Sequence, residues 1–220
     1  MKNNAELQKD VQDAIKWEPL LNAAEIGVTV KDGIVTLTGT VDDYFKKTEA
    51  EDAAKNVAGV KAVVEKIEVK YASSWAEKDD NEIATEVINA LNYNWRIPNN
   101  KIKVKVEKGW VSLEGEVQWY YQKEAVKNAV KNLSGVVGVS NNITIKHETL
   151  DQIEKKDIES ALERNWSIYP KNIIVKASDH KVTLTGRVKS WYEKDEAERT
   201  AWKAPGVWMV DNELAIEYTC

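Results

Sequence analysis

The sequence has few of the residues that build covalent or metal-bound cores. Its 220 residues include one cysteine, Cys220, and two histidines, His147 and His180. A single thiol excludes a disulfide framework within the chain and a cysteine-cluster metal site. Two histidines leave little for a zinc or iron centre. We therefore expect no metal and no cofactor, and three interpretations of Cys220 stay open: an inert thiol, an oxidation artefact, or a regulated bridge between chains.

Long apolar runs and a strong excess of one charge are also missing. No apolar stretch approaches the roughly 18 residues needed to span a bilayer, and the first residues lack the apolar core of a signal peptide. We predict no transmembrane segment and a cytoplasmic location, or a periplasmic one if the chain is a processed mature form. The 31 Lys and Arg against 36 Asp and Glu give a net charge of −5. Because this balance exerts no global attraction on polyanions, no nucleic-acid partner is expected.

The chain does contain an internal repeat. The stretches VTLTG, VSLEG and VTLTG occur at residues 35–39, 111–115 and 182–186, and the copies align around them without a gap over about 55 residues. Each stretch ends in a glycine, and a second glycine follows it 20 residues later, giving the pairs Gly39 and Gly59, Gly115 and Gly135, and Gly186 and Gly206. We predict three tandem domains over residues 1–72, 78–147 and 150–220.

The periodicity changes in the same order in every copy. Helical spacing, as in Leu7, Val11 and Ile15, gives way to the alternation of strands, with a turn at Asp32-Gly33, Lys108-Gly109 or Asp179-His180. Helical spacing then returns, and a last strand follows. This order predicts an α+β fold of three α-β-β-α-β units, each with two helices packed on one face of a three-stranded sheet. The first glycine is predicted to allow a bend or a close backbone approach, and the second to end the second helix.

These features resemble a known family. The anchors VTLTG and AGV (58–60), the element order and the two glycines 20 apart are similar to the BON domain (bacterial OsmY and nodulation), and all three copies match. The resemblance implies that each sheet is mixed. It also implies non-enzymatic roles: attachment to phospholipid or membrane surfaces, protection in osmotic stress, or chaperone-like support of the cell envelope.

Residues for catalysis are not arranged in any recognisable pattern. Neither histidine has the neighbours of a nucleophile-activating base, and no H-E-x-x-H or calcium-loop pattern occurs. The anchor glycines lack the following lysine of a phosphate-binding loop. The pairs Asp42-Asp43 and Asp79-Asp80 are predicted to sit at helix starts, where carboxylates accept hydrogen bonds from free backbone N–H groups. We therefore predict that the protein is not an enzyme.

The middle copy is the basic one. Residues 81–146 contain nine Lys and Arg against six Glu, whereas residues 7–70 contain nine Lys against twelve Asp and Glu. Lys101, Lys103 and Lys105 alternate with apolar residues, so the three ammonium groups are expected on one face of a strand. Two interpretations compete: contact with anionic lipid head groups, or a solvated strand that lysine protects against edge pairing.

Aromatic residues recur at two places in the repeat. Trp119, Tyr120 and Tyr121 follow the second strand of the middle copy, where the other copies carry Trp191-Tyr192 and Tyr44-Phe45. These corners suit a membrane interface or a protein partner, or they pin the second helix to the sheet. Trp17, Trp95 and Trp166 lie near the end of the first helix, where packing is the preferred interpretation.

Two functional hypotheses follow from these patterns. The first is a stress-associated, non-enzymatic binding protein that attaches to an anionic phospholipid surface, or to a partner, through the lysines and aromatics of the middle copy. The alternative is a chaperone-like or scaffolding protein that binds client or envelope proteins through the aromatic corners.

Overall fold

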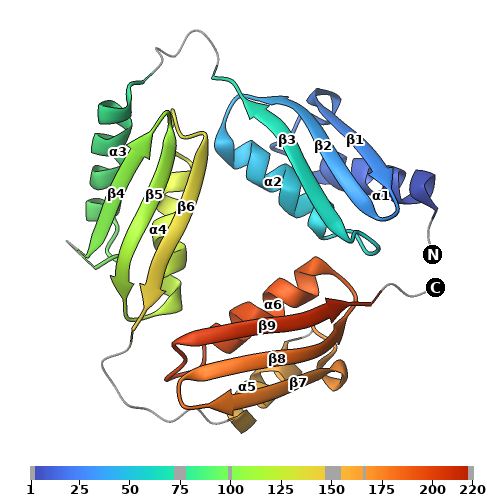
Figure 1. Cartoon of the computed structure of the whole chain (residues 1–220). Coiled ribbons are helices and arrows are strands. Elements are labelled where there is room, and N and C mark those ends of the chain that lie inside the picture. Colours follow the sequence, from blue (N-terminus) through green and yellow to red (C-terminus); the bar gives the residue numbers. More distant parts are fainter. Residues whose placement is uncertain (1–2, 72–77, 99–100, 147–154, 166, 218–220) are drawn as a thin grey trace. The chain divides into compact units, whose positions relative to one another are not determined.

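The computed structural model describes residues 3–71, 78–98, 101–146, 155–165 and 167–217, which form three similar domains (Figure 1). Domain 1 contains α1 (Asn4–Trp17), a 3₁₀ turn (Ala23–Glu25), β1 (Ile26–Lys31), β2 (Ile34–Val41), α2 (Tyr44–Lys55) and β3 (Ala62–Val69). Domain 2 contains α3 (Asp80–Tyr93), β4 (Ile102–Glu107), β5 (Trp110–Val117), α4 (Tyr120–Lys131) and β6 (Gly138–Ile145). Domain 3 contains α5 (Lys155–Arg164), a 3₁₀ turn (Pro170–Asn172), β7 (Ile173–Ser178), β8 (Lys181–Val188), α6 (Trp191–Trp202) and β9 (Met209–Ile216).

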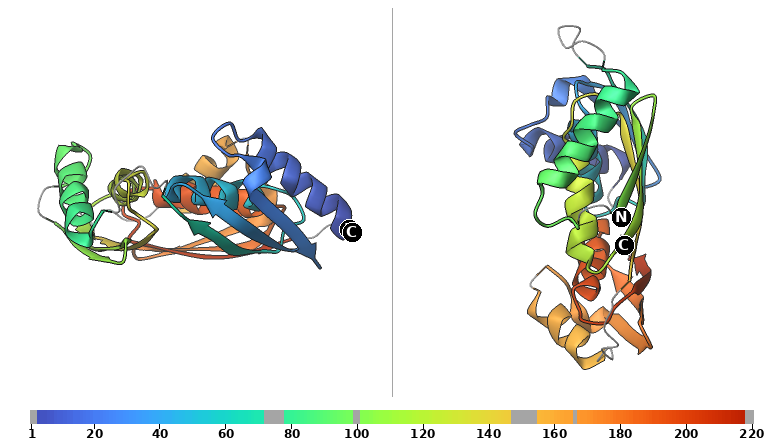
Figure 2. Two further views of the ribbon diagram at one scale, coloured as in Figure 1. Left: turned by 90° about the horizontal axis from the view of Figure 1, so that it is seen from above. Right: turned by 90° about the vertical axis from the view of Figure 1, so that its left-hand side faces the viewer.

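Each domain has one mixed sheet of three strands, in the order β1-β2-β3, β4-β5-β6 or β7-β8-β9. In domain 2 the middle strand β5 runs antiparallel to β4, with Ile102 opposite Gly115, and parallel to β6, with Trp110 opposite Gly138. Domain 3 repeats this pattern. Within each domain both helices cover the same face of the sheet (Figure 2). The predicted α+β architecture is therefore confirmed.

The first two strands of every domain are joined by a two-residue turn. Its first residue is Asp32, Lys108 or Asp179, and all three have a φ between 52° and 54°. Positive φ gives the turn the twist that tight hairpins need, and Gly33 and Gly109 supply it at the next position. Domain 3 carries His180 there instead, and its ring stacks on Trp208 with centroids 3.6 Å apart. The turns predicted from the sequence are present in all three copies.

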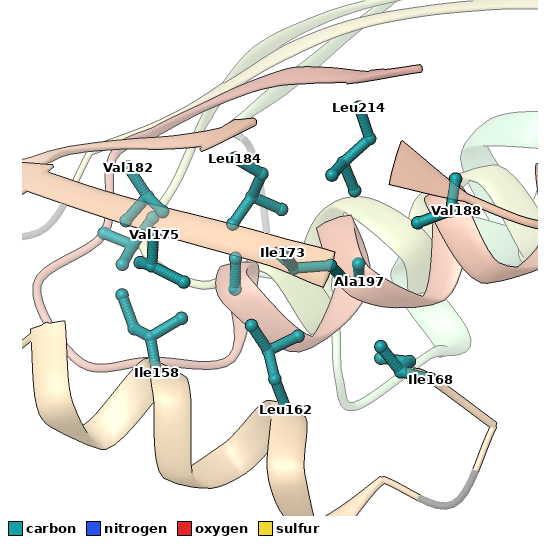
Figure 3. Close-up of a cluster of buried hydrophobic side chains, with 12 residues drawn as sticks. Ile158, Leu162, Ile168, Ile173, Val175, Val182, Leu184, Val188, Ala197 and Leu214 are labelled. Atoms are coloured by element: carbon teal, nitrogen blue, oxygen red, sulfur yellow. The ribbon is translucent and has the colours of Figure 1, made fainter. Parts of the chain in front are cut away.

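Domain 3 shows how the core is built from alternating and helical patterns. On β8, Val182, Leu184 and Val188 point inward and are almost completely buried. On α5, Ile158 and Leu162 lie one turn apart and meet these side chains, together with Leu214 of β9 (Figure 3). Spacing of four residues on a helix and two on a strand places each apolar set on a single face. The polar faces of the elements are thereby left for other contacts.

The first anchor glycine allows two backbones to approach closely. Gly115 has a φ of +153° and Gly186 a φ of +126°. A β-carbon at Gly115 would overlap the carbonyl oxygen of Lys101, and one at Gly186 would overlap that of Asn172. The start of β4 or β7 therefore lies close against the middle strand at the one position without a side chain.

The second glycine does not end the second helix, so this prediction was wrong. Helix α4 ends at Lys131, and tighter turns follow, in which Leu133 N–H donates to Val130 and Val136 N–H donates to Leu133. Gly135, with a φ of +92°, lies inside the last of these turns. A β-carbon there would come within 2.8 Å of the Ile83 side chain on α3. The glycine is required by this turn and by the packing of the turn on the first helix.

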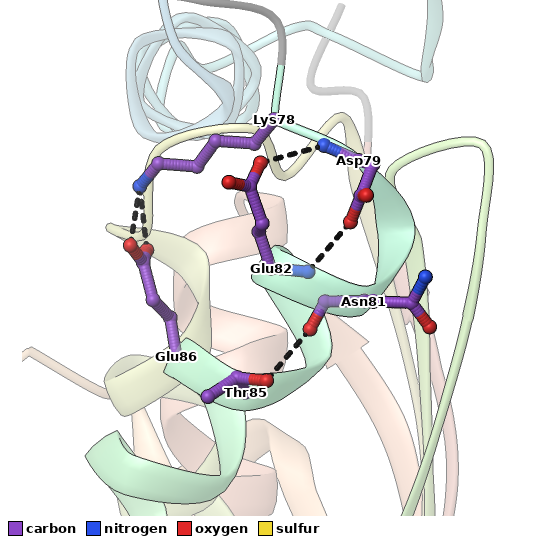
Figure 4. A network of polar contacts seen from close by, with 6 residues as sticks. All are labelled: Lys78, Asp79, Asn81, Glu82, Thr85 and Glu86. Atoms are coloured by element: carbon purple, nitrogen blue, oxygen red, sulfur yellow. Dashed lines mark hydrogen bonds and ion pairs between the residues drawn. The ribbon is translucent and has the colours of Figure 1, made fainter.

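The start of α3 is fixed by reciprocal hydrogen bonds (Figure 4). The Asp79 carboxylate accepts from the backbone N–H of Glu82 at 2.8 Å, and the Glu82 carboxylate accepts from that of Asp79 at 3.0 Å. Lys78 pairs with Glu86 at 2.6 Å beside them. Asp80 serves a different purpose, because its carboxylate accepts from the backbone N–H groups of Lys108 and Gly109 at 2.8 and 2.9 Å. It thereby ties the helix to the hairpin turn.

Replacing Asp80 with alanine is expected to destabilise domain 2 by about 2 kcal/mol, because two backbone donors lose their acceptor. Replacement with asparagine should cost less, since Asn4 holds the same position in domain 1 and accepts from Asp32 N–H at 3.0 Å. Native-state hydrogen exchange of β4 and β5 amides measures both effects within domain 2. Equal exchange rates in wild-type and Asp80→Ala protein would contradict the prediction.

Candidate functional site

The sheet topology brings four segments to one end of domain 2. Since β4 is antiparallel to β5, it begins where β5 ends, with Ile102 opposite Gly115. Since β6 is parallel to β5, both strands end together, with Val117 opposite Ile145. The loop after α3 leads into β4, and the connection from β5 to α4 leaves from the same end (Figure 1). Side chains from distant parts of the domain sequence therefore gather there.

An open groove of about 670 Å³ lies at this end, and we call it the lysine groove. Val111, Leu113 and Val117 of β5 point toward the helices and are buried, so Glu116 between them points to the outer face of the sheet. Lys103 lies on the same outer face, opposite Glu114. The groove is lined by Lys101 and Lys103 at the start of β4, Gly115, Glu116 and Gln118 along the middle, and Lys146 just after β6.

The structure separates the three lysines predicted to act together. Lys101 and Lys103 line the lysine groove, but Lys105 does not, and its Nζ lies 3.0 Å from the Glu107 carboxylate. The third cation of the groove is Lys146, which the sequence analysis did not single out. Its backbone N–H donates to the Val117 carbonyl, which holds it beside the end of β5. The signal was available in the repeat, because Lys146 follows the last predicted strand directly.

The other two domains do not reproduce this cluster. Lys70 is the counterpart of Lys146 in domain 1, and its Nζ lies 2.9 Å from the Glu68 carboxylate. That hydrogen bond and the charge of Lys70 hold the pKa of Glu68 below its usual value. In domain 3 the counterpart is Glu217, which lies 3.4 Å from Arg187. The groove lysines thus distinguish domain 2 from both of its neighbours in the sequence.

Exposed aromatic residues stand at the same end of domain 2. Tyr93, the last residue of α3, is 89% exposed, and Trp95 in the following loop is 85% exposed. The loop is held by Ile97, which is buried, and the Arg96 guanidinium lies 5.2 Å from the Trp95 ring centre. The packing role predicted for Trp95 was wrong, and Trp17 is equally exposed in domain 1. Trp166 lies outside the described residues.

The aromatic corners after the middle strand are partly exposed. Tyr120 is half-buried, whereas Trp119 and Tyr121 are 39% and 54% exposed. The backbone at this corner is fixed by Gln122, whose Oε1 accepts from the N–H groups of Gln118 and Trp119 at 3.0 Å each. In domain 3, Trp191 is likewise half-buried and Tyr192 is 43% exposed. Each corner thus anchors its helix with one ring and presents another to solvent.

Domain 3 holds a buried acid that sequence reasoning missed. Glu193 is only 4% exposed. Its two carboxylate oxygens accept from the backbone N–H of Tyr169 at 2.5 Å and from that of Lys189 at 2.7 Å. Glu193 occupies the position of Gln122, and Lys189 that of Gln118, so one of the two hydrogen bonds is shared between the domains. The second donor is Trp119 in domain 2 and Tyr169 in domain 3. Its role in the described structure is to hold backbone rather than to do chemistry.

The described residues contain neither a metal-binding cluster nor a membrane-spanning helix. Within the described ranges, no three His, Cys, Asp or Glu side chains are grouped so that they could hold a metal ion. No helix in those ranges combines the length and the apolar character needed to cross a bilayer. His147 and Cys220 lie outside the part of the chain that the structure describes.

The fold and the repeat agree with a family comparison. The BON domain model matches residues 3–71, 79–147 and 151–218, and the chain therefore belongs to the BON domain family. The curated protein "Osmotically-inducible protein Y" of Escherichia coli (strain K12) is 29% identical over 129 residues. That match covers 57% of this chain and 64% of the relative, so the chain spans less than two thirds of the relative's length.

Solved structures with similarity include two of CdsD, a structural protein of the type III secretion system of Chlamydia trachomatis. The first is 16% identical with a TM-score of 0.26 and covers 95% of this chain and 91% of the other. The second, of the C-terminal domain, is 17% identical with a TM-score of 0.25 and covers 98% of this chain and 100% of the other. Neither carries a conclusion about function.

Proposed function

We propose that this BON protein is a stress-associated, non-enzymatic binding protein that attaches to anionic phospholipid surfaces through one end of domain 2. The observation that carries the proposal is the presence of Lys101, Lys103 and Lys146 at the same end as the exposed ring of Trp95. The stress association rests on the similarity to the osmotically inducible relative.

Cations and aromatics contribute to membrane attachment in different ways. Each lysine near an anionic surface contributes about 1 kcal/mol, and this contribution falls off within a Debye length. Tryptophan and tyrosine have an apolar body and a polar edge, which suits the boundary between head groups and acyl chains. Trp95 and Tyr93 have almost all of their surface free for such a contact. The two effects together favour an anionic membrane over a neutral one.

The test is sedimentation of the full chain with vesicles of phosphatidylcholine alone and of phosphatidylcholine mixed with phosphatidylglycerol. We expect binding to the anionic vesicles that weakens between low salt and about 0.15 M, where the Debye length is about 8 Å. The triple variant Lys101→Ala/Lys103→Ala/Lys146→Ala should bind about 100-fold more weakly, since three lysine contributions are lost. Trp95→Ala should reduce the binding that remains at higher salt.

A matched variant controls for net charge. Lys171→Ala/Lys176→Ala/Lys181→Ala removes three lysines from domain 3, and its vesicle binding should stay close to that of the wild type. If both triple variants lose binding equally, the attachment follows net charge and the proposal is wrong. If the wild type ignores both kinds of vesicle, the proposal also fails. The chaperone-like alternative is then favoured, because Trp119 and Tyr121 offer exposed rings to a protein partner.

A further inference from the structure

We infer that the lysine groove is a built site for one phosphate group, in which Lys101, Lys103 and Lys146 hold the phosphate oxygens. This inference deepens the proposed function, because a phospholipid head group carries such a phosphate. It goes further in assigning a discrete, saturable site. A diffuse positive surface would attract any anion in proportion to its charge.

The three ammonium groups are available for a ligand. Among the residues that the structure describes, the side chains of Lys101, Lys103 and Lys146 have no hydrogen bond or ion pair. Two comparable lysines are paired: Lys105 of β4 with Glu107, and Lys70, the counterpart of Lys146 in domain 1, with Glu68. Three unpaired cations around one groove repel one another, and an anion between them would relieve that repulsion.

The absence of a partner for Lys146 has a local cause. In domain 1 the acid that pairs with Lys70 is Glu68, two residues earlier on the last strand. The corresponding residue in domain 2 is Thr144, whose hydroxyl donates to the Gly115 carbonyl at 3.2 Å. Domain 2 thus has an uncharged residue where domain 1 has the pairing acid, and it keeps the lysine. The substitution frees the Lys146 ammonium group at the edge of the groove.

The strand geometry places the cations on two sides of one strand. Lys103 lies on β4 and Lys101 directly precedes this strand, whereas Lys146 follows β6, so the pair and the single lysine flank β5. Between them lie Gly115, which has no side chain, and Gln118, which offers an amide. Lysine binds phosphate as a point charge, and three of them from two sides can surround one group.

The charges of the groove set the class of ligand. Three lysines and Glu116 line it, which leaves an excess of two positive charges. That excess matches a phosphate monoester or inorganic phosphate, and it also accommodates the single charge of a phosphodiester head group. Both kinds of ligand present the same cluster of phosphate oxygens. A binding experiment distinguishes a soluble phosphate from a lipid head group.

The experiment is a titration of the full chain, labelled with ¹⁵N, with inorganic phosphate and separately with glycerol 1-phosphate at constant ionic strength. We expect saturable shifts of the amides of Lys101, Lys103, Glu116 and Lys146. Lys103→Met/Lys146→Met should weaken the binding at least tenfold, since two of three ammonium groups are lost while their apolar stems remain. Lys105→Met removes the same charge from the same strand and should leave the binding unchanged.

A second variant is expected to strengthen phosphate binding rather than weaken it. Glu116→Gln removes the one acid of the groove without changing its shape, and it should tighten phosphate binding about fivefold. The inference would be overturned if the amide shifts did not saturate with phosphate. It would also be overturned if Lys103→Met/Lys146→Met and Lys105→Met gave equal amide shifts. Vesicle binding that phosphate and glycerol 1-phosphate do not compete with would overturn it too, and would leave the proposed function standing. Phosphate binding without vesicle binding supports the site, with a soluble phosphate as ligand, and removes the membrane proposal.

Discussion

Valine in place of Gly115 is expected to unfold domain 2, at a cost of about 4 kcal/mol or more. The backbone of Gly115 has a φ of +153°, a region that a β-branched side chain avoids. In addition, the β-carbon would overlap the carbonyl oxygen of Lys101, which is backbone and cannot move aside as a flexible side chain would. Both effects act where the start of β4 pairs with β5, so the two strands cannot pair around the new side chain.

The measurement is hydrogen exchange of the β4, β5 and β6 amides, because the chain has three domains and a single unfolding midpoint would mix them. Ser112→Val is the matched control. Ser112 lies on the outer face of β5 in ordinary strand backbone, and valine there should change stability by less than about 0.5 kcal/mol. If the amides of Gly115→Val were as well protected as those of the wild type, the close approach of the Lys101 carbonyl to residue 115 would not be essential.

Removing the carboxylate of Glu193 should cost domain 3 about 3 kcal/mol or more. Glu193→Ala leaves the backbone N–H groups of Tyr169 and Lys189 without their acceptors in a place that is almost closed to water. Each buried donor without a partner costs about 1–3 kcal/mol. Loss of protection in β7, β8 and α6, measured by hydrogen exchange, is the expected result.

Replacing Glu193 with glutamine tests whether both carboxylate oxygens are needed. In domain 2, Gln122 suffices because the counterpart of Tyr169 is Pro98, which has no N–H to donate. In domain 3 the N–H groups of Tyr169 and Lys189 donate to different oxygens of the carboxylate, and an amide in the same orientation has an acceptor at only one of these two places. The stability of domain 3 in Glu193→Gln should therefore lie between that of the wild type and that of Glu193→Ala. Equal stability of wild type and Glu193→Gln would show that the second oxygen contributes nothing.

Much of the fold could be predicted because each element leaves a local pattern. The turn at Lys108-Gly109, the alternation of Ile102, Val104 and Val106, and the spacing of Leu7, Val11 and Ile15 each depend on neighbours a few residues away. The end of α4 could not be placed in this way. A glycine with positive φ signals a turn, and only the packing against Ile83 shows which turn it is.

The candidate site depends on contacts between distant residues, and there the sequence was less informative. Lys101, Lys103 and Lys105 look equivalent on one strand, and only Glu107 and the position of Lys146 separate them. Trp95 looks like a packing residue because it follows an amphipathic helix. Its exposure is decided by the loop, in which Ile97 takes the buried position and turns the tryptophan outward.

The repeated topology also affects how the newly synthesised chain avoids pairing strands of different domains. Every middle strand pairs with the first and the last strand of its own domain. If adjacent copies had the same strand sequences, a strand of one copy could pair with a strand of the next. Such mispairing between neighbouring domains is a known hazard of repeat proteins. The identical stretch VTLTG occurs in β2 and β8, and the copy between them carries VSLEG in β5. On a ribosome, consecutive nascent domains therefore differ in this stretch at two outward-facing positions, Ser112 and Glu114, while the buried Val and Leu are the same. Exchanging VSLEG for VTLTG would make three successive central strands alike and raise the yield of misfolded chains.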